Sequence, residues 1–201
     1  MITFYNHIIN PNFPILQKKV FEKFGLEINQ IFVNDWKSHG DCMDDYLKDK
    51  NDENEVIVLF DIDSIPLNAQ IVPNAIAWCK DNIGIFSVAQ RAVKLDNPII
   101  HAAPSFMVFS IKTYNNLGRP TFTTNIRSDC GAEMTHNARE KGIEVRLLYP
   151  THVESPHAQL DGYIKFGYGT TYGHSIYHAF ESRFKTKDSF FINKCNWILN
   201  G

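Results

Sequence analysis

Residues 55–67 read EVIVLFDIDSIPL, an unbroken apolar run that leads directly into two aspartates. A short apolar run of this kind is typical of a strand that is covered on both faces, as in the middle of a parallel sheet. The same run also fits one turn of a buried helix. Its β-branched residues and the nearby Pro66 favour the strand, because β-branched side chains suit a pleated surface and residues before proline avoid the helical region. The pattern therefore predicts a buried strand that ends at the aspartates.

Asp61 and Asp63 are two positions apart, so in extended chain both carboxylates point to the same side. They follow the C-terminal end of the predicted strand, which is where open α/β sheets bind ligands. Two close carboxylates repel each other unless a cation lies between them. Mg²⁺ and Mn²⁺ bind one or two carboxylates and fill their other positions with water and substrate phosphates. The pair thus indicates a phosphate-bearing substrate held through a metal, whereas the plain alternative is an exposed turn.

The composition is that of a globular protein. The chain has 201 residues, of which 44% are hydrophobic and 13% aromatic, enough for one α/β domain with a substantial core. The net charge of −2 gives no field that recruits nucleic acid or an anionic membrane. The sequence contains neither a long apolar run nor a charged and then apolar N-terminus, so we expect no membrane span and no signal peptide. The four cysteines form no CxxC, which argues against a zinc site and indicates buried or free thiols in a reducing compartment, as in a cytoplasmic protein.

The rest of the chain alternates between strand and helix patterns. Strands are expected over residues 2–5, 28–33, 56–60, 84–89, 106–111 and 143–150, and helices over residues 11–24, 67–82, 112–118, 130–141 and 189–199. The acidic segment 40–54 reads as a short exposed helix and loop with a solvated face. Residues 151–173, rich in Gly, His, Tyr and Pro, suit loops and irregular strands around a site. This order predicts an α/β protein with a largely parallel sheet and helices on both faces.

Several segments together resemble the nucleotide-sugar glycosyltransferases of the GT-A fold. The strand that ends in Asp61-Ile62-Asp63 is similar to their DxD motif. Residues 104–118 resemble the acceptor-side strand and turn, and residues 129–150 the helix–strand unit that follows. Residues 177–183 are similar to the late loop that brings a metal-binding histidine to the DxD. The likeness is greatest to small viral and phage domains such as those of chlorella viruses, and a viral source would place the protein in the host cytoplasm.

The resemblance implies a single GT-A-like, Rossmann-like domain over residues 1–201, with a mixed, mostly parallel central sheet and helices on both faces. It implies Mn²⁺ or Mg²⁺ as cofactor, a nucleoside-diphosphate sugar as donor, and a glycan or another hydroxyl compound as acceptor. Carried over to this chain, Asp63 is a direct metal ligand, Asp61 contacts the metal or the donor ribose, and His178 is the third protein ligand. The metal would stabilise the departing nucleoside diphosphate as a Lewis acid.

Further polar residues are candidates for the same site. If the enzyme inverts the anomeric carbon, a carboxylate must take the acceptor's proton, and Asp129 at a predicted helix N-terminus is the candidate. An ordinary helix cap explains Asp129 equally well. By analogy with the first two strand ends of GT-A proteins, Asn6 and Asp35 are candidates to bind the nucleotide base. Arg91 and Arg183 are candidates to hold phosphate.

Two other classes fit the central motif. Haloacid-dehalogenase-like phosphatases also place Asp-x-Asp after an apolar strand and use the first aspartate, here Asp61, as nucleophile. Those enzymes continue with Gly-Thr, where this chain has Ser64-Ile65, and they carry a later acidic pair that is missing after residue 63. A non-catalytic module that binds a sugar or nucleotide is the third interpretation.

Overall fold

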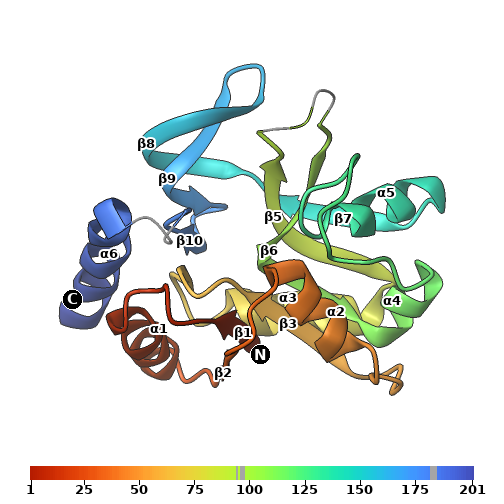
Figure 1. Ribbon diagram of the computed structural model, residues 1–201, viewed down its shortest axis with the longest axis horizontal. Coiled ribbons are helices and arrows are strands. Elements are labelled where there is room, and N and C mark those ends of the chain that lie inside the picture. The colour runs from red at the N-terminus through yellow and green to blue at the C-terminus, as the bar shows by residue number, and fades with distance from the viewer. Residues whose placement is uncertain (94, 96–97, 182–184) are drawn as a thin grey trace.

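A mixed sheet forms the centre of the protein, whose computed structural model describes residues 1–93, 95, 98–181 and 185–201 (Figure 1). Within these residues the sheet has six strands in the order β2-β1-β3-β6-β5-β7. They are β1 (Ile2–Tyr5), β2 (Asn29–Phe32), β3 (Val56–Phe60), β5 (Gly84–Arg91), β6 (Ile100–Ser110) and β7 (Glu144–Leu148). β1 is parallel to β2 and β3, β5 is parallel to β7, and β6 runs antiparallel to both of its neighbours. The expected mixed, mostly parallel sheet is confirmed.

Helices cover both faces of this sheet (Figure 1). On one face lie α1 (Asn12–Lys23) and α3 (Ile71–Asp81), with α6 (Asp188–Asn200) packed against α1. On the other lie α2 (His39–Leu47), α4 (Ile111–Asn116) and α5 (Ala132–Glu140). Val58 and Phe60 of β3 are buried in the first core, and Ile57 and Leu59 in the second. Because successive side chains of a strand point to opposite faces, a strand between two cores must be apolar throughout, as residues 56–60 are.

A second, antiparallel sheet lies beside the first. Its strand order within the described residues is β4-β10-β9-β8, and the strands are β4 (Ser64–Pro66), β8 (Pro150–Asp161), β9 (Ile164–Tyr172) and β10 (Ile176–His178). The expectation of irregular strands over residues 151–173 is confirmed, but the expectation of loops is wrong, because β8 and β9 form one long hairpin. The register of this hairpin shifts at three places along β8. Each shift breaks the alternation of side chains, which hides the strand pattern in the sequence.

The acidic segment 40–54 is only partly solvated. α2 buries Met43 and Leu47 in the second core. Asp44 Oδ1 accepts the backbone N–H of Phe122 at 2.7 Å, and Asp41 Oδ1 accepts the Thr123 hydroxyl at 2.8 Å. The expectation of a solvated face is therefore wrong for these two aspartates, which attach the segment 121–123 to α2.

The start of α5 differs from the sequence prediction. The helix begins at Ala132, and its N-cap position is taken by Gly131, whose φ of +76° is a left-handed conformation that favours glycine. Asp129 is not the cap, and its Oδ1 instead accepts the N–H of Cys130 at 2.8 Å. The predicted cap is wrong because the chain makes a further turn, from Asp129 O to Ala132 N, before the helix begins.

Glu133, in the first turn of α5, holds the preceding loop. Its carboxylate accepts hydrogen bonds from Arg127 Nη2 at 2.6 Å, from the Ser128 hydroxyl at 2.6 Å and from Asn125 Nδ2 at 2.9 Å. The hydrogen bond from Arg127 is the main cause that lowers the pKa of Glu133 from 4.5 to about 2, with smaller contributions from Ser128 and Asn125. A charged group with these partners stabilises the loop that carries Asp129.

We expect Glu133→Gln to lower the free energy of unfolding by about 2 kcal/mol at pH 7, because the charge-assisted hydrogen bonds are lost. A carboxyl whose pKa falls on folding stabilises the protein above its unfolded pKa, and this contribution disappears as the pH falls through the folded pKa. The difference between wild type and variant should therefore be constant above about pH 4.5 and vanish near pH 2. Urea unfolding at a series of pH values measures this difference in the free energy of unfolding.

The control is Glu140→Gln. Glu140 lies 3.9 Å from the same arginine, but its side chain is 64% exposed, so we expect a change below about 0.5 kcal/mol. An equal loss at pH 7 and pH 3 in the Glu133 variant would show that the loss does not come from the carboxylate charge.

Candidate functional site

The site begins in the tight turn between β3 and β4. The N–H of Ser64 donates to the carbonyl of Asp61 at 3.0 Å, which closes the turn. Gln17 of α1 is fully buried, and its Nε2 donates to the carbonyls of Asp61 at 2.8 Å and Ser64 at 3.0 Å. Buried carbonyls need such partners, so Gln17 fixes the backbone that carries both aspartates.

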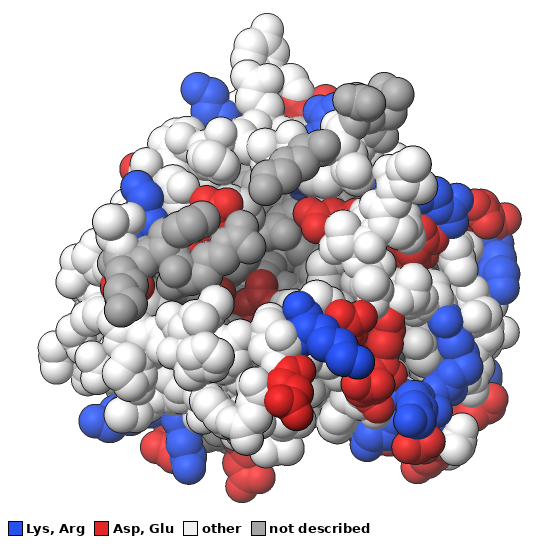
Figure 2. Space-filling model, viewed as in Figure 1, with Lys and Arg blue, Asp and Glu red and all other residues white. Residues whose placement is uncertain are grey.

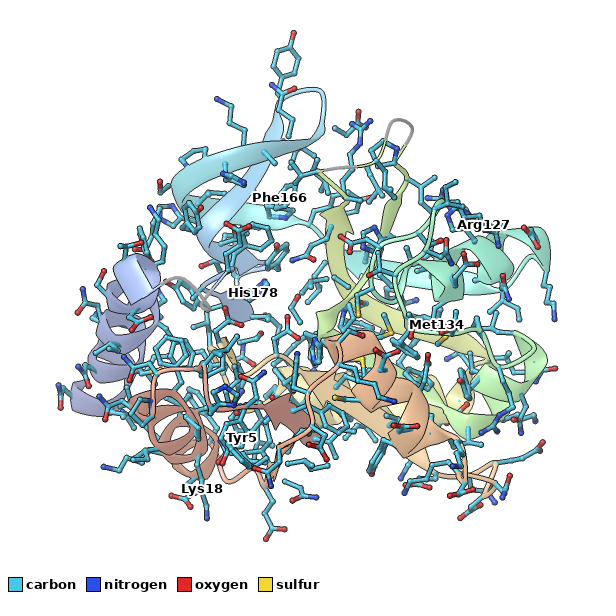
Figure 3. The ribbon with its side chains drawn as sticks, viewed as in Figure 1. Tyr5, Lys18, Arg127, Met134, Phe166 and His178 are labelled. Carbon is cyan, nitrogen blue, oxygen red and sulfur yellow. The ribbon has the colours of Figure 1, made fainter. Side chains whose placement is uncertain are left out.

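His178 reaches this turn through strand pairing. β10 is antiparallel to β4, with His178 opposite Ser64. The Ser64 hydroxyl donates to Tyr177 O at 3.2 Å, and the N–H of Ala179 donates to the carbonyl of Asp63 at 3.0 Å. Residues that are far apart in the sequence are thus placed side by side, and Figure 3 shows His178 at β10 near the middle of the molecule.

Asp61, Asp63 and His178 form one cluster. His178 Nε2 lies 3.3 Å from Asp63 Oδ1 and 3.5 Å from Asp61 Oδ2. One ligand atom from each residue falls within 4.8 Å of the others, and the structure contains no other metal-compatible group of this kind among the residues it describes. Asp63 and His178 are buried, whereas the side chain of Asp61 is 24% exposed. The two aspartates and the histidine that the sequence predicts as metal ligands therefore lie together.

The charges of the cluster are mutually dependent. Burial raises the pKa of Asp61, the two neighbouring histidines His39 and His178 oppose this rise, and Asp63 adds to it. Burial by itself would lower the pKa of His178, but Asp63 and Asp61 outweigh it and raise that pKa. Two carboxylates in a partly buried site thus compete for the proton of one imidazole, an arrangement that a divalent cation would relieve.

The donor set fits a divalent cation. Neighbouring ligands around an octahedral ion with bonds of about 2.1 Å lie about 3 Å apart. The distances of 3.3 and 3.5 Å from His178 Nε2 to the two carboxylates are close to this spacing. Asp61 Oδ1 is buried and accepts no hydrogen bond of good geometry, although His39 Nδ1 lies 3.2 Å away. A buried carboxylate oxygen without a hydrogen bond has capacity for a ligand.

A pocket of about 680 Å³ opens over the cluster. Figure 2 shows this face hollowed, with acidic side chains in the hollow. The candidates from the sequence that line the pocket are Asn6, Asp61, Asp63, Arg91, Asp129 and His178. Asp35 is exposed and is not among the described residues that line it, and Arg183 lies outside the described residues. The pocket is also lined by Trp36, Gln90, Cys130, Phe180 and Glu181.

The polar candidates differ in how they are held. Asn6 is buried, and its Oδ1 accepts the N–H of Ile8 at 3.0 Å in a local turn. Arg91 is half-buried, and its Nη1 donates to Leu160 O at 3.4 Å, which directs it toward β8. Asp129 is exposed beside the half-buried Cys130. Burial and the charges of Asp61 and Asp129 raise the pKa of the Cys130 thiol well above its ordinary value, which disfavours the thiolate.

His39 is a site residue that the sequence did not reveal. It is the first residue of α2, whose N-cap is Ser38, and its ring stacks on Trp36 at 5.9 Å. Its Nδ1 is the group 3.2 Å from Asp61 Oδ1. The position of His39 could have been inferred from the fact that the loop after β2 and the end of β3 meet at one sheet edge. Using it requires the strand order β2-β1-β3, which no sequence pattern supplies.

Comparison of the chain with models of known protein families and with curated proteins gave no match. In the described part of the chain, no helix combines the length and the apolar character needed to cross a membrane. The residues of the pocket are therefore the basis for inferring function, and the resemblance to GT-A enzymes stays a prediction.

If the cluster holds a divalent cation, Mn²⁺ should stabilise the folded protein. At one hundred times its dissociation constant the ion contributes about 2.7 kcal/mol, which for a chain of this length raises the melting temperature by about 5–10 °C. Asp63→Asn should abolish the rise, because a neutral amide replaces a buried anionic ligand. Differential scanning calorimetry with and without MnCl₂ measures it.

Asp45→Asn is the matched control, since Asp45 is exposed on α2 and lines no part of the pocket. Asp45→Asn should show the same Mn²⁺-dependent rise in melting temperature as the wild type. The same rise in the Asp63 variant would place the Mn²⁺ elsewhere on the protein.

Proposed function

We propose that this protein is a metal-dependent glycosyltransferase that moves a sugar from a nucleoside-diphosphate sugar to a hydroxyl group of a glycan or another acceptor. The observation that carries the proposal is that Asp61, Asp63 and His178 meet in one pocket. An Asp-x-Asp pair with a late histidine is the donor-site pattern of the GT-A enzymes that the sequence resembles. The pocket, at about 680 Å³, lies in the usual range for small-molecule sites.

On the donor side, the three clustered residues hold the cation. When bound, Mn²⁺ or Mg²⁺ supplies Lewis-acid stabilisation of the charge on the departing nucleoside diphosphate. Gln17 fixes the turn of the two aspartates, so their oxygens need little rearrangement to bind. Arg91, which lines the same pocket, supplies a positive charge for the diphosphate.

The nucleoside would bind at the side of the pocket formed by the ends of β1 and β2. Asn6 and Trp36 line that side. Trp36 directly follows Asp35, so the residue next to the predicted one lies in the pocket. An indole ring and an amide suit a flat, hydrogen-bonding base.

On the acceptor side, Asp129 takes the hydroxyl proton. Its Oδ1 is occupied by the N–H of Cys130, which leaves Oδ2 to accept the proton. The carboxylate is exposed at the pocket and lies on a loop held by Glu133. This role applies to transfer with inversion at the anomeric carbon.

The geometry is less favourable for a phosphatase with Asp61 as nucleophile. Oδ1 of Asp61 lies 3.2 Å from His39 Nδ1, and Oδ2 lies 3.5 Å from His178 Nε2, so both oxygens are beside imidazoles. Among the described residues, the third member of the cluster is a histidine and not a further carboxylate. A binding module without catalysis has the same geometry and is distinguished by turnover.

The test is the release of nucleoside diphosphate from a panel of UDP-, GDP- and dTDP-sugars with Mn²⁺. We expect release from donors of one base, with water or an added glycan as acceptor, and complete loss with a chelator. Asp63→Asn should lower kcat/KM by about 100-fold or more, because the ligand for the charge-stabilising ion is weakened. Asp45→Asn should have the wild-type rate.

Asp129→Asn separates binding from chemistry. It should lower kcat by about 100-fold or more through loss of the base, with unchanged Mn²⁺-dependent donor binding. Release of phosphate from an aryl phosphate with a phosphoryl group on Asp61 would assign the protein to the phosphatases. Donor binding without release from any donor would make it a binding module.

A further inference from the structure

Gln90, at the end of β5, contacts the nitrogen of His178 that faces away from the aspartates. Gln90 Nε2 lies 3.2 Å from His178 Nδ1, while Nε2 of the same ring lies 3.3 Å from Asp63 Oδ1. His178 is only 4% exposed, so neither ring nitrogen can exchange its partner for bulk water. Phe180 packs edge-on against the ring at 5.7 Å and 83°, which restrains its plane. The orientation of the Gln90 amide is therefore linked to the position of the proton on the ring.

The two states of the site need opposite tautomers. With the Gln90 NH₂ group donating to Nδ1, the proton of a neutral ring is on Nε2 and points to the aspartates. A ring that binds a cation through Nε2 must offer the lone pair there and carry its proton on Nδ1. That proton needs an acceptor, and the amide oxygen of Gln90 becomes one when the amide turns by half a revolution about its terminal bond.

We infer that Gln90 is a positioning residue, whose amide turns over when the site takes up a divalent cation and then holds His178 as a ligand through Nδ1–H. The inference rests on the proposed metal site and extends it to a residue outside the cluster. Such outer partners of ligating histidines commonly contribute a factor of about 10–100 to metal affinity.

The alternative for Gln90 is simple packing. It is half-buried at a strand end, and a large side chain of any kind could fill its place. Two substitutions separate the roles. Methionine has a similar length but no strong hydrogen-bonding group. Glutamate has the same shape and, when ionised, acts only as an acceptor, so it can accept a hydrogen bond from Nδ1–H but cannot donate one.

The experiment measures Mn²⁺ binding to the purified full chain by electron paramagnetic resonance of the free ion. Gln90→Met should raise the dissociation constant about 10–100-fold, and Gln90→Glu should leave it unchanged or lower it. Pulsed resonance should detect coupling of the bound ion to a histidine nitrogen in the wild type and in Gln90→Glu, with weaker coupling in Gln90→Met. Gln70→Met is the control, because Gln70 is exposed and its side chain makes no cap hydrogen bond.

Wild-type affinity in Gln90→Met would overturn the inference and leave the metal site in place. An equal loss in both variants at position 90 would also overturn it, since packing alone predicts that result. No Mn²⁺ binding to the wild type would overturn both the site and the role of Gln90. If Gln90→Met does not fold, Gln90→Glu decides alone, and a loss of more than about 10-fold contradicts the inference.

Discussion

The candidate site is arranged around the repulsion between two carboxylates that are fixed in one short turn. Asp61 and Asp63 cannot move apart, because Gln17 holds the carbonyls of the turn and β3 and β4 hold its two ends. The neighbouring groups are arranged around this negative charge, with an imidazole from α2 and another from β10 against the carboxylates. A protein that keeps such a costly arrangement in a pocket commonly uses it for binding or chemistry.

Both sheets contribute residues to this pocket. The central sheet brings the ends of β1, β2, β3 and β5 to one edge, as expected of parallel strands, and the second sheet brings His178 across to them. Helices on both faces bury the strands that carry the site, so its supports are rigid elements. The loops add the residues whose roles are least constrained, such as Asp129 and Trp36.

The sequence predicted what local patterns can encode. The apolar run at 56–60 indicated a strand between two cores. The Asp-x-Asp spacing indicated two of the three residues of the cluster, and His178 was predicted only through the family resemblance. The approach of His39 to Asp61 depends on strand order, which is a property of the whole fold. The β8–β9 hairpin could not be predicted because register shifts break the alternation of its side chains. Asp129 is not the helix cap, because a glycine in the left-handed conformation occupies the N-cap position.

The pairing of β4 with β10 has a consequence for biosynthesis. Ser64 and Tyr177, which this pairing joins, are 113 residues apart. A ribosome-bound chain that ends before β10 already contains both aspartates but lacks the imidazole that completes the set. The three side chains can therefore meet only after the chain has been synthesised through β10 and has closed this long-range contact.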